Sequence, residues 1–360
     1  MPRLGRTAAL IANLVTGLAM SLTMSLGLTA CGDATPGYVL HLAQGQMQVL
    51  LDSQPIQQVR AQTTDPARLA QLDWVDSVRA YAGEIGLRGA HTNYSRFYDT
   101  GAHPISYNVS ASPVDELSPF QWKFPFLGAL PYKGYFDRQR AVDEAQRLTE
   151  LGYDALARPV AAYSTLGYLP DPLLSSMLDD GEARLADLLL HELTHVTIFA
   201  DGQVDYNEST ASFVGRQGAL DMMRRRYGAN AAQVDSIRIR REDSTNFTEF
   251  IGTLLDQLDS LYAQDLKRDE ILTSRDQLLR AAQERYRQHP QLAGSRYDGF
   301  LRWERVNNAR LLSYRRYNRD LHLFTAVHDA QRADLKASLP IFAHCAEQTD
   351  PWDCLEQAGR

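Results

Sequence analysis

The sequence is poor in basic residues and in cysteine, and it has no repeated or low-complexity segment. Among its 360 residues, 37 Lys and Arg stand against 44 Asp and Glu, which gives a formal net charge of −7. This deficit of positive charge argues against nucleic acid or an anionic membrane patch as a partner. The absence of repeats and of low-complexity tracts gives no sign of a repeat architecture or of disorder. The length suffices for one large domain or two tightly packed subdomains.

The first 30 residues have the layout of a secretory signal. Arg3 and Arg6 give a positive start, and the stretch 7–27 that follows carries no charge. The segment ends in small residues before Cys31, as cleavage sites do. An uncleaved membrane anchor is the alternative, because about 20 apolar residues can span a bilayer. Asn13 and the many Thr, Ser and Gly residues make this stretch a weak span, so we favour the signal.

The end of this segment, Leu28-Thr29-Ala30-Cys31, resembles the lipobox of bacterial lipoproteins. The resemblance implies an exported protein in which Cys31 is acylated and becomes the mature N-terminus, so that a lipid anchor holds the chain on a membrane. Loss of Arg3 and Arg6 with the signal would change the net charge from −7 to −9. Gly32, where an Asp would favour the inner membrane, favours the periplasmic face of the outer membrane.

Two further cysteines, Cys345 and Cys354, lie close together near the C-terminus. Disulfides persist in the compartments that exported proteins reach. We therefore expect a local disulfide between them, which leaves Cys31 for the lipid. Two free thiols are the alternative.

The pattern of apolar residues predicts an α+β fold with one small sheet and a mainly helical C-terminal half. Steps of three and four residues predict helices within 38–81, interrupted at Pro55 and Pro66. The remaining expectations are short strands within 91–136, a helix over 141–151, a strand over 155–168, helices over 182–199 and 206–227, and an almost wholly helical stretch from 243 to 338.

These elements divide the chain into four segments. They are the lipoprotein signal at 1–30, a region of N-terminal helices and small sheet at 31–180, a helix pair that carries the candidate site at 181–228, and a helical C-terminal region at 229–360.

Residues 191–195 read His-Glu-Leu-Thr-His within one of the expected helices. Residues four apart lie on one helix face, so the imidazoles of His191 and His195 can bind a single zinc ion. The carboxylate of Glu192 would then lie beside the metal, where it could act as general base on metal-bound water. The alternative is a chance occurrence, with two histidines that bind no metal. The helical context and an available third ligand favour the zinc site.

Two residues compete for the position of third ligand. In the metzincin pattern a His or Asp lies six residues after the second histidine, with a Gly halfway that lets the chain turn. Asp201 occupies the sixth place, but Ile198 occupies the Gly place and resists positive φ. Glu208, within Asn207-Glu208-Ser209-Thr210-Ala211, fits the Asn-Glu-x-x-Ala motif of gluzincins, in which a second helix offers the glutamate.

A structural role for Glu208 is the alternative to metal binding. Asp205 can cap the second helix, and Glu208, three residues later, can complete a capping pair. We favour the ligand, because two His, one Glu and a water form a catalytic zinc set. The small residues Ser209, Ala211 and Ser212 would let the two helices approach closely.

The chain resembles a bacterial family of predicted zinc aminopeptidases that are exported as lipoproteins, over almost all of the mature sequence. Beyond the zinc motif, the segments that carry the resemblance are Gly45-Gln46, Pro131-Tyr132-Lys133-Gly134-Tyr135-Phe136, residues 162–167, Asp171-Pro172-Leu173-Leu174, Tyr206-Asn207-Glu208-Ser209 and Asn307-Asn308-Ala309. The resemblance implies a zincin-like metallopeptidase core of the gluzincin type that acts on peptides. It implies one Zn²⁺ per chain held by His191, His195 and Glu208, with Glu192 as base.

One departure from the family is visible. Members often carry cysteines at the positions that Lys123 and Ala129 hold here. Both cysteines are absent together, as expected if a disulfide was lost as a unit. This chain therefore lacks that local disulfide, and the departure does not affect the expected zinc chemistry.

The sequence leaves the type of peptidase open. An aminopeptidase needs an anion near the metal for the substrate's ammonium group, for which Asp171, Asp201 and Asp205 are candidates. An endopeptidase would lack that anion, and a non-catalytic envelope lipoprotein would use the metal only to clamp two helices. Candidates for the oxyanion donor are Tyr163, Tyr314, Tyr317, His103 and His322, and Asn207 is a further candidate for substrate contact.

Overall fold

The computed structural model describes residues 33–101, 103–124, 128–160, 162, 169–301 and 306–360. The signal, Cys31 and Tyr163 lie outside them. The helices are α2 (Pro36–Asp52), α3 (Ile56–Gln62), α4 (Pro66–Ile85), α5 (Arg138–Glu150), α6 (Glu182–Thr197), α7 (Val204–Tyr227), α8 (Ala232–Tyr262), α9 (Arg268–Arg287), α10 (Asn308–Arg316), α11 (Leu321–Ala330), α12 (Leu335–Ala346) and α13 (Pro351–Ala358). The strands are β1 (Gln54–Pro55), β2 (Arg96–Tyr98), β3 (Tyr107–Pro113), β4 (Trp122–Phe124), β5 (Gly128–Leu130), β6 (Lys133–Tyr135), β7 (Tyr153–Pro159) and β8 (Leu173–Leu174).

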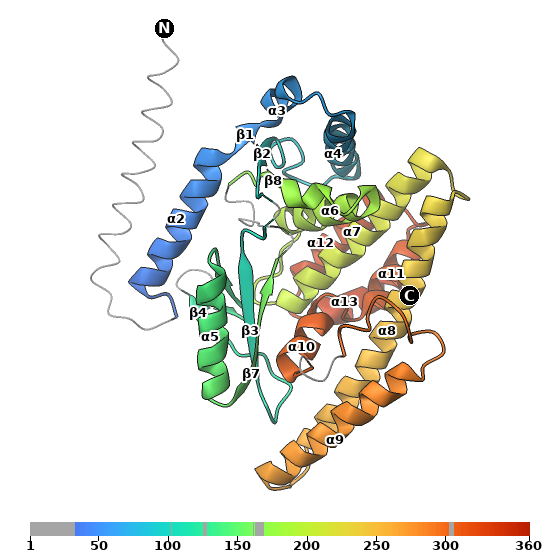
Figure 1. Cartoon of the computed structure of the whole chain (residues 1–360). Helices are drawn as coiled ribbons and strands as arrows, with labels where there is room; N and C mark the ends of the chain where they lie inside the picture. Colours follow the sequence, from blue (N-terminus) through green and yellow to red (C-terminus); the bar gives the residue numbers. More distant parts are fainter. Residues whose placement is uncertain (1–32, 102, 125–127, 161, 163–168, 302–305) are drawn as a thin grey trace.

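The expectation of one small sheet is wrong, because the strands form three. β3 is the central strand of an antiparallel sheet with β6 and β7, and α5 covers one face of it (Figure 1). β1, β2 and β8 form a second sheet, in which β8 pairs with β2 in parallel and then leads through a short 3₁₀ turn into α6. Among the described residues, β4 and β5 pair only with each other.

The β4–β5 hairpin places Lys123 and Ala129 directly opposite each other. These are the two positions at which members of the resembled family often carry cysteines. Side chains of directly opposed residues lie on the same face of a sheet at short distance. The register would therefore allow a cross-strand disulfide between cysteines at these two positions.

Local sequence signals explain where several helices begin. Pro66 is the first residue of α4, where its missing N–H costs nothing, and the Asp65 side chain accepts a hydrogen bond from the Ala67 N–H. Asp137 caps α5 in the same manner through the Arg140 N–H. The expected interruptions at Pro55 and Pro66 thus coincide with the starts of α3 and α4.

Helix α7 lies at the centre of the molecule. It packs against α6, α8, α10, α11 and α12, and most of its residues are buried, so it has no polar face. The largest apolar core joins residues of α4, of α6 and α7, and of α11 to α13. Three of the four sequence segments therefore share one core around the helix pair.

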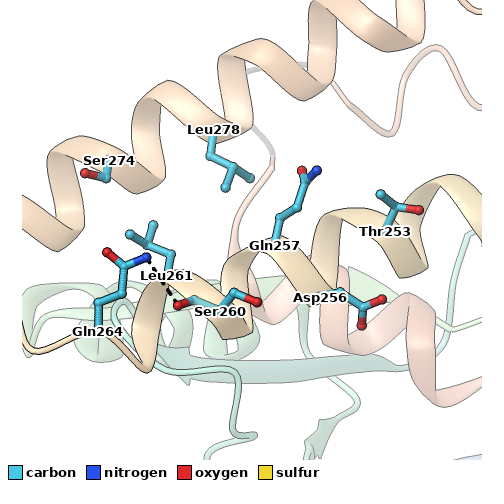
Figure 2. A pocket seen from close by; sticks show the side chains of 8 residues that line it. All are labelled: Thr253, Asp256, Gln257, Ser260, Leu261, Gln264, Ser274 and Leu278. Carbon is cyan, nitrogen blue, oxygen red and sulfur yellow. Dashed lines mark hydrogen bonds between the residues drawn. The ribbon is translucent and has the colours of Figure 1, made fainter.

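The long helices α8 and α9 form a pair that extends away from this core (Figure 1). Between them lies a hollow of about 400 Å³, with Leu261 and Leu278 on opposite walls (Figure 2). Asp256 is its only titratable lining residue, so the hollow offers no set of groups for chemistry. No helix in the described part of the chain is both long enough and apolar enough to cross a membrane.

Candidate metal centre

The two helices that carry the zinc motif pack backbone to backbone. Leu185, Leu189 and Leu193 bury the apolar stripe of α6. On α7, a Cβ at Gly215 would lie 2.5 Å from the Asp187 carbonyl oxygen, and a Cβ at Gly218 would lie 2.5 Å from the Leu190 side chain. A Cβ at Gly215 would clash with backbone, so this position requires glycine for the observed approach, whereas a Cβ at Gly218 would displace the end of the Leu190 side chain.

This packing brings His191, His195 and Glu208 together. The two Nε2 atoms lie 3.2 Å apart, and the Glu208 Oε2 lies 3.3 Å from the Nε2 of His191 and 3.5 Å from that of His195. Ligand atoms about 2.0–2.1 Å from a tetrahedral zinc ion are themselves about 3.3 Å apart. The three atoms therefore have the spacing of one face of a zinc tetrahedron. They form a group of potential metal ligands in which every ligand atom lies within 4.8 Å of the others.

The state of Glu208 supports a cation at this position. Its side chain is buried, and its Oε2 has no hydrogen-bond donor among the described residues. Burial opposes the charge of this carboxyl, but the adjacent His195 and His191 hold its pKa well below the usual range. Burial likewise opposes the charge of His195, whose pKa is nevertheless raised by Glu208. A buried carboxylate oxygen that no hydrogen bond satisfies is suited to ligate a metal ion.

Glu192 lies on α6 between the two histidines and is partly exposed. Its charge contributes, after burial and Glu208, to the raised pKa of His195. It also contributes, after burial, to the raised pKa of the Tyr94 hydroxyl, on which Asp171 acts as well. Glu192 is therefore close to the ligand cluster without belonging to it, as a general base would be.

Of the two candidates for the third ligand, the structure places Glu208 beside the histidines. Asp201 is exposed and does not belong to the ligand cluster. Ile198 has the extended backbone of a helix terminus (φ −125°), and the positive φ occurs later, at Gly202 (φ +70°). The chain thus turns too late for the metzincin arrangement, and it presents Glu208 instead.

The expected capping role of Asp205 is wrong. Helix α7 begins at Val204, its N-cap is Gln203, and no side chain caps it. Asp205 lies in the first turn and faces two cations, with Arg316 at 3.9 Å and Arg319 at 3.7 Å. Glu208 therefore has no cap to complete, and the alternative role considered for it is not observed.

Of the candidate oxyanion donors, Tyr317 lies at the cluster. Its ring stacks on the His191 imidazole with centroids 6.0 Å apart, and the Arg158 guanidinium lies over the same ring at 5.4 Å. An Arg158 N–H donates to the Tyr317 hydroxyl at 3.4 Å. Burial, followed by the charge of Glu208, raises the pKa of Tyr317 to about 12, so its hydroxyl remains a donor.

The other candidates lie elsewhere. Tyr314 forms a hydrogen bond with Thr248 of α8, His103 is exposed, and His322 lines a different cavity. The Asn207 amide donates to the Ala200 carbonyl and accepts from the Ala200 N–H. Asn207 therefore fixes the loop between α6 and α7, which leaves little capacity for substrate.

The structure adds residues to the site that the sequence did not single out. Burial and the charge of Glu208 raise the pKa of the Tyr132 hydroxyl, on which Tyr317 and Glu192 act as well. The Arg316 guanidinium lies 5.6 Å from the centre of the Tyr132 ring. Tyr132 belongs to a segment that carries the family resemblance, and that was its only signal in the sequence. No signal in the sequence pointed to Arg158 or Arg316.

Asn307 and Asn308 hold α10, and with it Tyr317, against the sheet of β6, β3 and β7. Asn307 caps α10 through the Arg310 N–H, and the Asn308 side chain donates to the Pro113 carbonyl at the end of β3. The Asn308 N–H donates to the Asp154 carboxylate at 2.8 Å. These contacts place the tail residue Tyr317 over the ligands of α6.

Cys345 and Cys354 form a disulfide that joins α12 to α13. Cys345 is fully buried within the largest apolar core, so the bridge secures the last helix to that core. It lies away from the ligand cluster, which contains no cysteine.

Comparison with known proteins identifies a family. A family model described as "Putative aminopeptidase" matches residues 37–350, which include every residue of the ligand cluster. Neither a curated protein nor a solved structure matches the chain. Since the family model covers most of the sequence, the chain belongs to this aminopeptidase family.

Proposed function

We propose that this protein is a zinc-dependent aminopeptidase with a zincin-like core of the gluzincin type. His191, His195 and Glu208 would hold one Zn²⁺, and Glu192 would act as general base. The observation that carries the proposal is the spacing of the three ligand atoms, 3.2–3.5 Å, around a buried Glu208 oxygen without a donor. Bound zinc would supply a Lewis acid that polarises a carbonyl and acidifies water.

The side chains around the ligands have complementary roles in peptide hydrolysis. Glu192 takes a proton from the attacking water and delivers it to the nitrogen of the leaving group. The Tyr317 hydroxyl, whose pKa of about 12 keeps it protonated, donates to the oxygen on which charge develops. Arg158 fixes that hydroxyl through its contact of 3.4 Å.

The aminopeptidase assignment requires an anion for the substrate's ammonium group, and Asp171 is our candidate. It is buried, and its charge acts with that of Glu192 on the Tyr94 hydroxyl, which indicates that both carboxylates are near this tyrosine. Of the other two acids considered, Asp201 is exposed and Asp205 faces Arg316 and Arg319.

Metal analysis paired with a substrate screen tests the proposal. The purified protein should contain about one zinc per chain, and it should cleave peptides with a free amino terminus but not their N-acetylated counterparts. Cleavage of both sets would make the protein an endopeptidase. Bound zinc without any cleavage would support the non-catalytic clamp.

Export and lipid anchoring complete the proposal. The support is the lipobox-like sequence at Cys31 and the character of α2, which begins five residues later. Before its last residue α2 carries no Asp, Glu, Lys or Arg, and Val39, Leu40, Met47 and Leu51 are exposed on it. An uncharged helix with exposed apolar side chains is compatible with a position against lipid. Mass spectrometry of the mature N-terminal peptide, with Cys31→Ser as control, tests the acylation.

A further inference from the structure

A second cavity lies beside the helix pair. It has a volume of about 810 Å³ and is bounded by residues of α6, α7, α8, α10 and α11. None of the proposed metal ligands lines it. Five arginines do, and they are Arg184, Arg216, Arg240, Arg241 and Arg296.

The acidic residues of the lining do not balance these arginines. Asp187 pairs with Arg184 at 2.8 Å, and Asp320 pairs with Arg319 outside the lining at 3.3 Å. Glu249 is the only other acidic residue that lines the cavity. One carboxylate therefore stands against the four remaining arginines.

These four arginines have no carboxylate within 4.0 Å among the residues that the structure describes. Arg216 donates to the Asn318 amide oxygen at 2.8 Å, and Arg241 donates to the Gln217 amide oxygen at 3.0 Å. Arg296 donates to the Arg240 carbonyl at 3.1 Å and to the Tyr297 hydroxyl at 2.7 Å. All of these acceptors are neutral, and a guanidinium group has five N–H donors. Most of the donors in this cluster are therefore available to a ligand.

The clustering of positive charge is unfavourable without a counter-charge. Arg241 is partly buried, and its burial, with the charges of Arg216 and Arg224, lowers its pKa, although the charges of Asp221 and Asp187 act in the opposite direction. Removing a charge from water next to like charges costs free energy, which an anion in the cavity would offset. The hydroxyl groups of Ser244 and Thr245 on α8 also line the cavity.

We propose that this cavity binds a small ligand that carries two or more negative charges on phosphate or carboxylate groups. Planar guanidinium groups match both kinds of group through paired N–H donors. The volume of about 810 Å³ suits a small molecule. Because α6, α7 and α8 contribute to the cavity, the bound ligand would link the long helix α8 to the helices of the metal centre.

Isothermal titration of the zinc-loaded protein tests this proposal with two probes, inorganic pyrophosphate and an N-acetylated triglutamate peptide. Zinc content is measured before and after, so that metal removal is not mistaken for binding. Arg240→Gln and Arg296→Gln change exposed side chains and should leave the fold intact, which circular dichroism verifies. Each should weaken binding by about tenfold or more. The matched control is Arg238→Gln on α8, whose side chain pairs with Asp235 and does not line the cavity, and its affinity should stay within about twofold.

Each outcome decides the matter. Saturable binding of pyrophosphate alone, weakened by the two cavity variants, supports a phosphate ligand, and binding of triglutamate alone supports a carboxylate ligand. Absence of saturable binding of both probes overturns the proposal. Equal affinity in the wild type and in Arg240→Gln and Arg296→Gln also overturns it, because the anion would then bind elsewhere, for example at the metal centre.

Discussion

Gly215 of α7 lies directly against Asp187 of α6, so that a Cβ at Gly215 would be 2.5 Å from the Asp187 carbonyl oxygen and 3.3 Å from the Cβ of His191. The first proposed metal ligand is therefore positioned by the absence of a side chain on the neighbouring helix. The spacing of the ligand atoms depends on this contact, because Glu208 lies on the same helix as Gly215.

Gly215→Ala should push the two helices apart. We expect a loss of about 1–3 kcal/mol in the free energy of unfolding, as for other overpacked sites, together with weaker zinc binding. Denaturant titration and zinc titration measure the two effects. The control is Gly252→Ala in α8, where a Cβ meets nothing within 4 Å, and this variant should gain about 0.4–1 kcal/mol. Equal stability of both variants would show that the contact is not limiting.

Glu192→Gln should abolish most of the peptidase activity while zinc stays bound, because the amide cannot accept the proton. General base catalysis contributes about 10²–10⁴-fold, so kcat should fall by that range. Steady-state kinetics and metal analysis on the same sample measure both properties. Glu182→Gln, at the start of α6 and paired with Arg226, should keep its activity. Full activity of Glu192→Gln would exclude the mechanism.

Glu208→Gln should lower the zinc content, because an amide oxygen is a weaker zinc ligand than a carboxylate. Asp201→Asn is the matched control, since it removes the acid that the metzincin pattern would use, and it should retain zinc. Metal analysis after dialysis against a weak chelator compares the two variants with the wild type. Loss of zinc from Asp201→Asn, with zinc retained by Glu208→Gln, would make Asp201 the third ligand.

Tyr317→Phe should keep the stacking on His191 and lose the hydroxyl. Removal of an oxyanion donor costs about 10²–10³-fold in kcat, with little change in KM. Tyr314→Phe, which loses a hydrogen bond to Thr248 away from the metal centre, should leave kcat within about twofold, a bound we set from the small effects of substitutions away from the site. A larger loss for Tyr314→Phe than for Tyr317→Phe would remove Tyr317 from the mechanism.

The double variant with Lys123→Cys and Ala129→Cys should form a disulfide under oxidising conditions. The two residues are direct cross-strand partners with exposed side chains, and such pairs are close enough to be bridged. Mass spectrometry of peptides before and after reduction detects the bond. Combining Lys123→Cys with Leu130→Cys shifts the pair by one residue to opposite faces of the hairpin, and no bond should form. A bond in the variant with Lys123→Cys and Leu130→Cys, and none in the variant with Lys123→Cys and Ala129→Cys, would indicate a different register.

The three residues of the candidate ligand cluster could be selected from the sequence because their arrangement is local. His191 and His195 share a helix face by spacing alone, and Glu208 follows on the next helix after a loop with Asp201 and Gly202. The capping role of Asp205 was predicted wrongly, because its attraction to Arg316 and Arg319 of the tail is tertiary and leaves no trace in the local sequence.

The residues around the ligands could not be selected in the same way. The chain has 17 tyrosines, and only the fold shows that Tyr317, and not Tyr314 one turn earlier, reaches His191. Gly215 and Gly218 lie inside a helix, where glycine is unfavourable, but only the position of α6 explains them. Long-range packing decides such features. Helix periodicity and turn residues decide helix boundaries such as those of α6 and α7, which were predicted well.

The anchoring of α10 by Asn307 and Asn308 has a consequence for the order in which the candidate site is completed during synthesis. His191, His195 and Glu208 belong to one continuous helix–loop–helix segment, so all three are synthesised before the C-terminal helices that bury α7. Tyr317 arrives more than a hundred residues later and docks only when Asn308 reaches β3. Under the proposed function, a product truncated before α10 would therefore contain the three candidate zinc ligands and lack the proposed oxyanion donor.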